Sequence, residues 1–154
     1  MNQYPSFESF ANAQIRNLNE LAQNTMVRES AIITAGAIKQ RIENFGDDTD
    51  GVKIESHSKH RFGAYSASWG KKRSEKGRQT AIVDLNFTGQ MWRDWKPVPT
   101  ADGWGATFVT KESMQKAKEN QAIFRTELFG PSDLEIKLGT NAMIQRAQKI
   151  MKRK

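Results

Sequence analysis

The sequence predicts an α+β fold, and three observations lead to that prediction. Apolar residues recur at steps of three and four in the first third of the chain, which is the period of a helix. Apolar and polar residues alternate in two central stretches, 81–87 and 104–110, which is the period of a strand. A helix-capping sequence then precedes a last periodic stretch. We therefore expect N-terminal helices, a small and mostly antiparallel sheet, and a capped C-terminal helix.

The N-terminal region, residues 6–45, has a helical pattern throughout. One stripe contains Ala11, Ile15, Leu18 and Ala22, and a more regular one contains Ala31, Ala35, Ile38, Ile42 and Phe45. Asn24 and Thr25 lie between the two stripes, which leaves open whether the region forms two helices or one long bent helix. Gly46 is expected to end the helix, because glycine is the usual residue just past a helical C-terminus.

The segment 46–80 has the composition of a long loop or extended arm. It is rich in Gly, Ser, Asp, His and Lys, and it has no sustained hydrophobic period. One acid, Glu75, accompanies its seven cations between residues 59 and 78, which are Lys59, Arg61, Lys71, Lys72, Arg73, Lys76 and Arg78. The stretch 59–78 therefore has a net charge of +6, which is most of the chain's net charge of +7.

The rest of the predicted sheet lies between residues 81 and 129. Ala81–Phe87 and Trp104–Thr110 are expected to pair as antiparallel strands, with a third strand at Ala122–Phe129. A short helical turn at 90–96 would direct Met91, Trp92 and Trp95 into the core, and turn residues including Pro97 and Pro99 would follow it. Lys111–Asn120 is expected to be a short charged helix.

The C-terminal helix has the clearest start signal. Ser132 and Glu135 stand at the two positions of a capping box, directly after Gly130 and Pro131. The expected buried face contains Leu134, Leu138, Ala142, Ala147 and Ile150, and Gly139 weakens the middle of the helix. With 154 residues, the whole chain (1–154) is expected to form a single domain around one core.

Composition narrows the function classes. The chain has no cysteine, which excludes disulfides, thiolate metal sites and cysteine nucleophiles. His57 and His60 are interpreted as two solvated histidines, because their segment is loop-like and lacks an evident third metal ligand. The sequence has no nucleophile elbow or phosphate-binding loop, so we expect no enzyme and no cofactor. The N-terminus does not resemble a signal peptide, and no apolar run is long enough to predict a membrane span.

The basic segment is the main candidate for binding, and three interpretations remain open. Aromatic residues interleaved with cations are typical of single-stranded nucleic-acid binders. They are also typical of an assembly arm whose aromatics enter a partner's pockets, and the third interpretation is a solvated charged loop. The candidate partner-facing or DNA-facing residues are Lys59, Arg61, Phe62, Tyr65, Trp69, Lys71, Lys72, Arg73, Lys76 and Arg78.

Several short motifs resemble a known class of viral proteins. They are Arg41–Gly46, Asp50–Ile54, Ala64–Ser66, Lys76–Thr80, Val83–Met91 and Phe129–Glu135, in that order. Together they resemble the neck, connector and tail-completion proteins of tailed bacteriophages, particularly those of crAss-like phages and other phages of Bacteroidetes. Ile54 is followed here by Glu55 instead of the family's usual glycine, and Tyr65 comes eleven residues later, so the arm is expected to carry an insertion.

The resemblance implies a structural function. Such proteins form rings beneath the portal, through which DNA passes. The resemblance therefore implies a virion protein that is assembled in the host cytoplasm. It also implies a homo-oligomeric ring at the head-to-tail junction, with portal, adaptor or tail proteins as partners. No membrane is expected among its partners. The alternative is a cytosolic nucleic-acid-binding domain that uses the basic segment 59–78.

Overall fold

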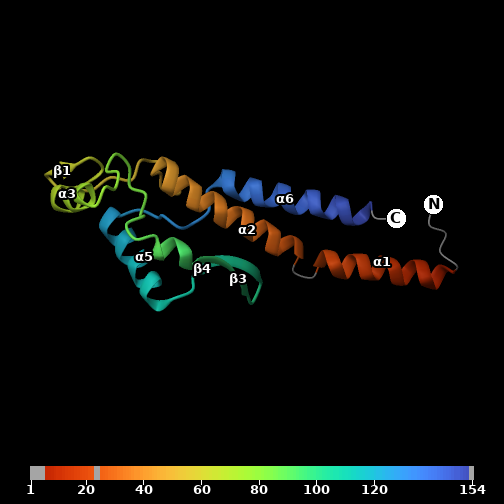
Figure 1. The fold of residues 1–154 in the computed structure, drawn as a ribbon. Helices are drawn as coiled ribbons and strands as arrows, with labels where there is room; N and C mark the ends of the chain where they lie inside the picture. Colours follow the sequence, from red (N-terminus) through yellow and green to blue (C-terminus); the bar gives the residue numbers. More distant parts are fainter. Residues whose placement is uncertain (1–5, 23–24, 153–154) are drawn as a thin grey trace.

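A computed structural model describes residues 6–22 and 25–152 of the chain (Figure 1). Its helices are α1 (Phe7–Ala22), α2 (Thr25–Gln40), the π-helical turn η1 (Arg41–Phe45), α3 (Ala67–Glu75), α4 (Gln90–Asp94), α5 (Lys111–Phe124) and α6 (Asp133–Met151). Its strands are β1 (Arg61–Phe62), β2 (Tyr65–Ser66), β3 (Trp95–Thr100) and β4 (Gly103–Phe108). Both pairs, β1–β2 and β3–β4, are antiparallel hairpins. The predicted α+β fold class is therefore confirmed.

Helices α2 and α6 pack side by side and form the long axis of the molecule, and α1 extends beyond one end of this pair (Figure 1). The two helices approach closely at Gly139. A Cβ atom at that position would lie 2.4 Å from Thr34 Oγ1 and 2.7 Å from Ser30 Oγ. The glycine that weakens α6 by propensity therefore permits the close packing of α6 on α2.

The predicted buried face of α6 is wrong at its N-terminal end. Leu134 and Leu138 are exposed, at 66% and 44%, whereas Glu135, Gly139 and Ile150 are buried. The helix is rotated so that its small residue, and not its leucines, faces α2. The capping box is confirmed: Ser132 Oγ accepts a hydrogen bond from the Glu135 amide, and Glu135 Oε2 accepts one from the Ser132 amide.

The N-terminal stripe is confirmed as far as Ile42. Ala35, Ile38 and Ile42 are buried, and Ala31 is half-buried. Phe45 was expected to continue the stripe but is 54% exposed, because the wider π-helical turn shifts the helical phase before the chain reaches it. Gly46 ends the turn in the left-handed conformation, as predicted. The open question of two helices or one bent helix depends on residues 23–24, which lie outside the described residues.

The sheet differs from the prediction. β4 was expected, but its partner is β3, where Pro97 and Pro99 had indicated a turn. Prolines are tolerated there because each strand of a two-stranded hairpin has a free edge. No strand forms between 81 and 87, where Leu85 adopts a left-handed φ of 52°. Residues 122–129 are also not a strand, because α5 continues to Phe124 and ends at Arg125.

One part of the core lies between α2 and the β3–β4 hairpin, and the core continues through η1 and the segment 46–80 to α4 and α5. Four aromatic rings pack there, with Trp95 and Phe108 centroids 4.9 Å apart and Phe129 against Phe108 at the same distance. Trp92 completes the group, and the Trp95 indole donates a hydrogen bond to the Ala35 carbonyl. Predicted burial of the tryptophans is thus confirmed for Trp92.

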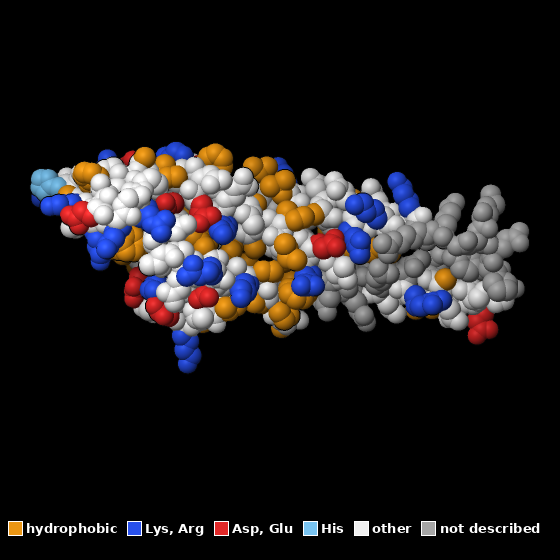
Figure 2. Space-filling view, in the orientation of Figure 1, with side chains coloured by type: hydrophobic (Ala, Val, Ile, Leu, Met, Phe, Trp, Pro, Cys, Tyr) orange, Lys and Arg blue, Asp and Glu red, His pale blue; other side chains and the backbone are white. Residues whose placement is uncertain are grey.

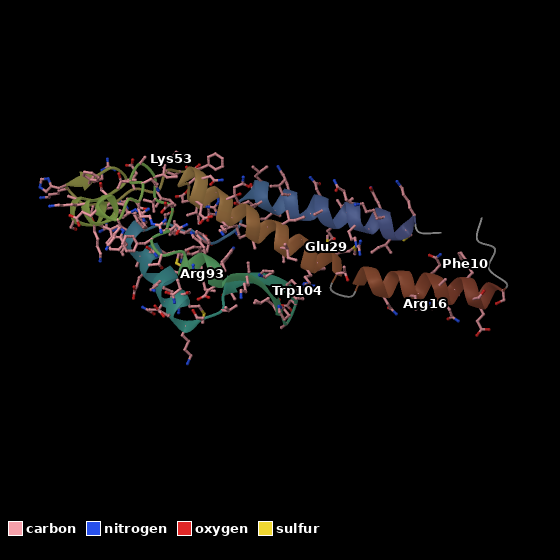
Figure 3. The ribbon with its side chains drawn as sticks, viewed as in Figure 1. Phe10, Arg16, Glu29, Lys53, Arg93 and Trp104 are labelled. Atoms are coloured by element: carbon pink, nitrogen blue, oxygen red, sulfur yellow. The ribbon has the colours of Figure 1, made fainter. Side chains whose placement is uncertain are left out.

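The outer end of the hairpin lies beside the first half of α2. Trp104 faces that helix, and the Arg28 guanidinium carbon lies 5.5 Å from its ring centroid (Figure 3). Glu29 on the same helix pairs with Arg146 of α6 at 3.7 Å. Within the described residues, no helix is long and apolar enough to cross a membrane.

Substituting Gly139 with Leu tests the close packing of α2 and α6. The added side chain cannot fit against Ser30 and Thr34, so we expect the free energy of unfolding to fall by about 1–3 kcal/mol. Gly36→Leu is the matched control, because Gly36 is an exposed helical glycine and a Cβ atom added there would have no neighbour within 4 Å. This control should gain up to about 1 kcal/mol from helix propensity. Equal effects in urea denaturation would contradict the packing argument.

Candidate assembly surface

The segment 46–80 is folded onto the body of the protein, which corrects the expectation of an extended arm or long loop. Ile54, Ala64 and Tyr65 belong to the hydrophobic core. The Ser56 amide donates to the Ala64 carbonyl, and the Ala64 amide donates to the Thr80 carbonyl, both at 2.8 Å. Main-chain bonds therefore tie both ends of the segment to the β1–β2 hairpin.

A buried ion pair joins α3 to the loop before α4. Arg73 Nη2 lies 2.9 and 3.0 Å from the two carboxylate oxygens of Asp84, and the Arg73 side chain is 1% exposed. The remaining guanidinium nitrogens donate to the carbonyl oxygens of Gln79, at 3.0 Å, and Asn86, at 3.3 Å. This cation is therefore fully paired within its own chain.

Tyr65 completes this cluster. Its hydroxyl donates to Asp84 Oδ1 at 3.2 Å and accepts from the Asp84 amide at 3.1 Å, while its ring lies 4.5 Å from the Arg73 guanidinium carbon. Burial, and secondarily the Asp84 charge, raises the pKa of the Tyr65 hydroxyl well above its ordinary value. Tyr65 and Arg73 were both expected to face a partner. Both are buried instead. The prediction was wrong because the sequence pattern does not reveal that the two side chains pair with Asp84.

The other candidates of the basic segment are exposed at the end of the molecule that is remote from α1 (Figures 1 and 2). Phe62 is 44% exposed and Trp69 is 37% exposed. Arg61 pairs with Glu55, and the Lys72 ammonium lies 5.0 Å above the Trp69 ring. The remaining exposed cations are Lys59, Lys71, Lys76 and Arg78.

A cavity of about 520 Å³ opens between α3 and α5, and we call it the α3–α5 pocket. Tyr65, Arg73 and Phe124 are buried residues in its wall. The more exposed lining includes Trp69, Phe87, Ile123, Lys116 and Glu119. Ile123 is 59% exposed, so the pocket presents apolar surface to solvent beside the basic face of α3.

A second apolar surface lies where η1 meets the start of α6, and we call it the α6 surface. Phe45, Leu134 and Leu138 line one open groove of about 690 Å³ together with Asp50 and Asp133. Sequence reasoning missed this surface, because it placed Phe45 and both leucines on the apolar stripes of their helices. The sequence did contain one signal of this arrangement, which was Gly139. This glycine lies on a different face of α6 from the two leucines, and a glycine within a helix can mark the face that packs closely on another helix.

Arg41 fixes the geometry of the α6 surface. Its Nε donates to Glu135 Oε1 at 2.8 Å, and its Nη1 donates to the Asp47 carbonyl at 3.0 Å. Its Nη2 donates to the carbonyl oxygens of Leu128, at 3.1 Å, and Gly130, at 2.9 Å. One side chain therefore joins the end of α2 to the start of α6 and to both loops beside the groove.

Neither histidine lines the α3–α5 pocket or the groove of the α6 surface. His57 Nε2 lies 3.0 Å from the Phe124 carbonyl oxygen, and His60 is exposed. Among the residues that the structure describes, no group of three or more His, Cys, Asp or Glu side chains could hold a metal ion.

Comparisons of the chain with protein-family models, with curated proteins and with solved structures found no match. Three of the short motifs of the sequence meet in the structure. Tyr65, Gln79 and Asp84 come from these motifs, and their side chains meet in the cluster around Arg73. These three motifs therefore hold the α3 end of the molecule in place.

Replacing Arg73 with Met tests the buried ion pair. The substitution leaves the Asp84 carboxylate without its cation, and we expect a loss of about 3–5 kcal/mol in the free energy of unfolding. Lys76→Met, on the exposed end of the same segment, should change stability by less than about 0.5 kcal/mol. Adding Asp84→Asn to Arg73→Met should restore part of the loss. Wild-type stability of Arg73→Met in chemical denaturation would contradict this role.

Alkaline titration tests the environment of Tyr65. The chain has two tyrosines, so a Tyr4→Phe variant reports Tyr65 alone through phenolate absorbance. We expect ionisation clearly above the ordinary pKa of 10.0. Because the folded-state pKa is raised, the stabilising effect is complete below pH 10 and is lost as the pH rises further. Tyr65→Phe should weaken this alkaline loss. Ionisation at the ordinary pKa in the folded protein would contradict the buried cluster.

Proposed function

We propose that this protein is a virion structural protein that oligomerises into a ring at the head-to-tail junction of a tailed phage. Its activity would be binding to copies of itself and to neighbouring neck or tail proteins. The observation that carries the proposal is the presence of two separate apolar surfaces, each open to solvent and each built on a fixed polar network.

The exposure of these surfaces is larger than a monomer requires. Leu134 is 66% exposed, Ile123 is 59% exposed and Phe45 is 54% exposed. Single exposed apolar residues are common, but apolar residues that share a groove or pocket are typical of interaction sites. Here they share the lining of one groove or one pocket.

The fixed framework beneath each surface also supports a role in assembly. Arg73 holds the wall of the α3–α5 pocket, and Arg41 holds the edge of the α6 surface. Side chains on a rigid framework lose less conformational entropy on association than those on a mobile arm. The sequence resemblance to neck and tail-completion proteins supplies the virion context.

A nucleic-acid-binding domain is the second candidate, favoured by the exposed cations on and after α3. Lys71, Lys76 and Arg78 are exposed beside Trp69, which offers a stacking face. Under this alternative, binding would weaken steeply with salt, with a logarithmic slope of about −0.7 for each phosphate neutralised on a single strand.

Gel filtration with light scattering, with and without single-stranded DNA, distinguishes the two. The ring proposal predicts a discrete oligomer mass at moderate salt that does not require DNA. A monomer at every protein concentration tested, together with salt-sensitive DNA binding, would overturn the ring proposal in favour of the nucleic-acid-binding alternative.

A further inference from the structure

We propose that copies of the chain associate head to tail, with the α6 surface of one copy entering the α3–α5 pocket of the next. This inference rests on the proposed ring and names the two surfaces that form its repeating contact. The occupant of the pocket is a second copy of this chain, presenting Leu134 and Leu138 as the inserted side chains.

Charge complementarity favours this pairing. The α6 surface has Asp50 and Asp133 at its apolar groove, and both are exposed. The pocket has Lys116 in its lining, and Lys72 lies over Trp69 and Phe87 at its wall. Opposite charges around two apolar patches favour the correct register and disfavour the pairing of each patch with itself.

Most other charged groups at the two sites are already paired. Lys53, near the end of α2 in Figure 3, pairs with Asp47 at 2.6 Å, and the buried Glu135 pairs with Arg41. At the pocket, Glu119 accepts a hydrogen bond from the neutral Gln115 amide and keeps its charge, but the cations Lys72 and Lys116 outnumber it there. Lys116 also pairs with Glu112, but both side chains are largely exposed, and exposed pairs are weak. Lys116 can therefore exchange that partner for a carboxylate of the next copy.

The spacing of the leucines and the size of the pocket are also compatible. Leu134 and Leu138 are one helical turn apart, and both are exposed on α6, so they present the spacing of a helix that inserts into a groove. The pocket, at about 520 Å³, has the size of cavities that enclose whole small molecules. It can therefore accept two leucine side chains together.

The positions of the surfaces determine the kind of assembly. The α6 surface is formed by α2, η1, the following loop and α6, whereas the pocket is formed by β2, α3, α4, α5 and their loops. The two share no residue, so one copy can use both at once. Such a contact is heterologous, and it closes into a ring when the rotation between neighbouring copies divides a full turn.

Engineered disulfides test the contact directly, because the chain has no cysteine. The double variant Leu134→Cys with Ile123→Cys should form a ladder of dimers, trimers and larger species on oxidation. Each single variant should give no species beyond a dimer. A double variant that forms no ladder, although the wild type is oligomeric by light scattering, would overturn the head-to-tail contact and leave the proposed ring standing.

Mixing two blocked variants provides a second test. Leu134→Arg blocks the α6 surface, and Ile123→Arg blocks the pocket; both positions are exposed, so both variants should fold, and the two arginines repel where a doubly changed contact would form. For each variant alone, the dissociation constant for self-association should rise at least about tenfold above that of the wild type. Mixed together, they should form a 1:1 heterodimer, because each retains the surface that the other lacks.

Ile144→Arg is the matched control, because Ile144 is 47% exposed on α6 but lies outside the α6 surface. It should assemble as wild type does. Wild-type assembly by both blocked variants would overturn this inference alone. A wild-type chain that stays monomeric, together with a double-cysteine variant that forms no ladder, would overturn both this inference and the proposed function.

Discussion

Burial of the Arg73 guanidinium against the Asp84 carboxylate is the interaction on which the α3 end of the molecule depends. Arg73 comes from a segment whose cations would otherwise repel one another, and its side chain is 1% exposed. A buried cation is costly unless it is paired and hydrogen-bonded, and here Asp84, Gln79 and Asn86 satisfy it. The same cluster fixes Tyr65, and therefore the wall of the α3–α5 pocket. The Arg73–Asp84 ion pair is therefore the reason that this charged segment folds into the wall of a pocket and does not extend as an arm.

A steric constraint has the corresponding effect on the other surface. Gly139 lets α6 lie close to α2, and this orientation turns Leu134 and Leu138 toward solvent. Arg41 then holds the start of α6 through Glu135. The apolar groove is therefore a consequence of tight helix packing on the opposite face of α6. The leucines contribute nothing to the core in this arrangement, which makes them available for association.

Sequence patterns correctly predicted the features that depend on neighbouring residues. They failed for features that depend on contacts between residues far apart in the chain. The Ala35–Ile42 stripe, the Gly46 terminus and the capping box at Ser132 are local, and all three are confirmed. The alternation around Leu85 predicted a strand, but hydrogen bonds that Arg73 and Trp92 donate to Asp84 shape that loop instead. The exposed cations of the candidate site were recognisable from composition. Burial of Tyr65 and Arg73, and exposure of Leu134, depend on partners far along the chain.

The central claim is that this chain assembles by itself through one repeated heterologous contact. Electron microscopy of the purified assembly, with the subunit number obtained by native mass spectrometry, tests it most directly. The account predicts closed rings of a single subunit number, in which α6 of each copy contacts α3 and α5 of its neighbour. Two-fold dimers joined through identical surfaces, or monomers under all conditions, would contradict it.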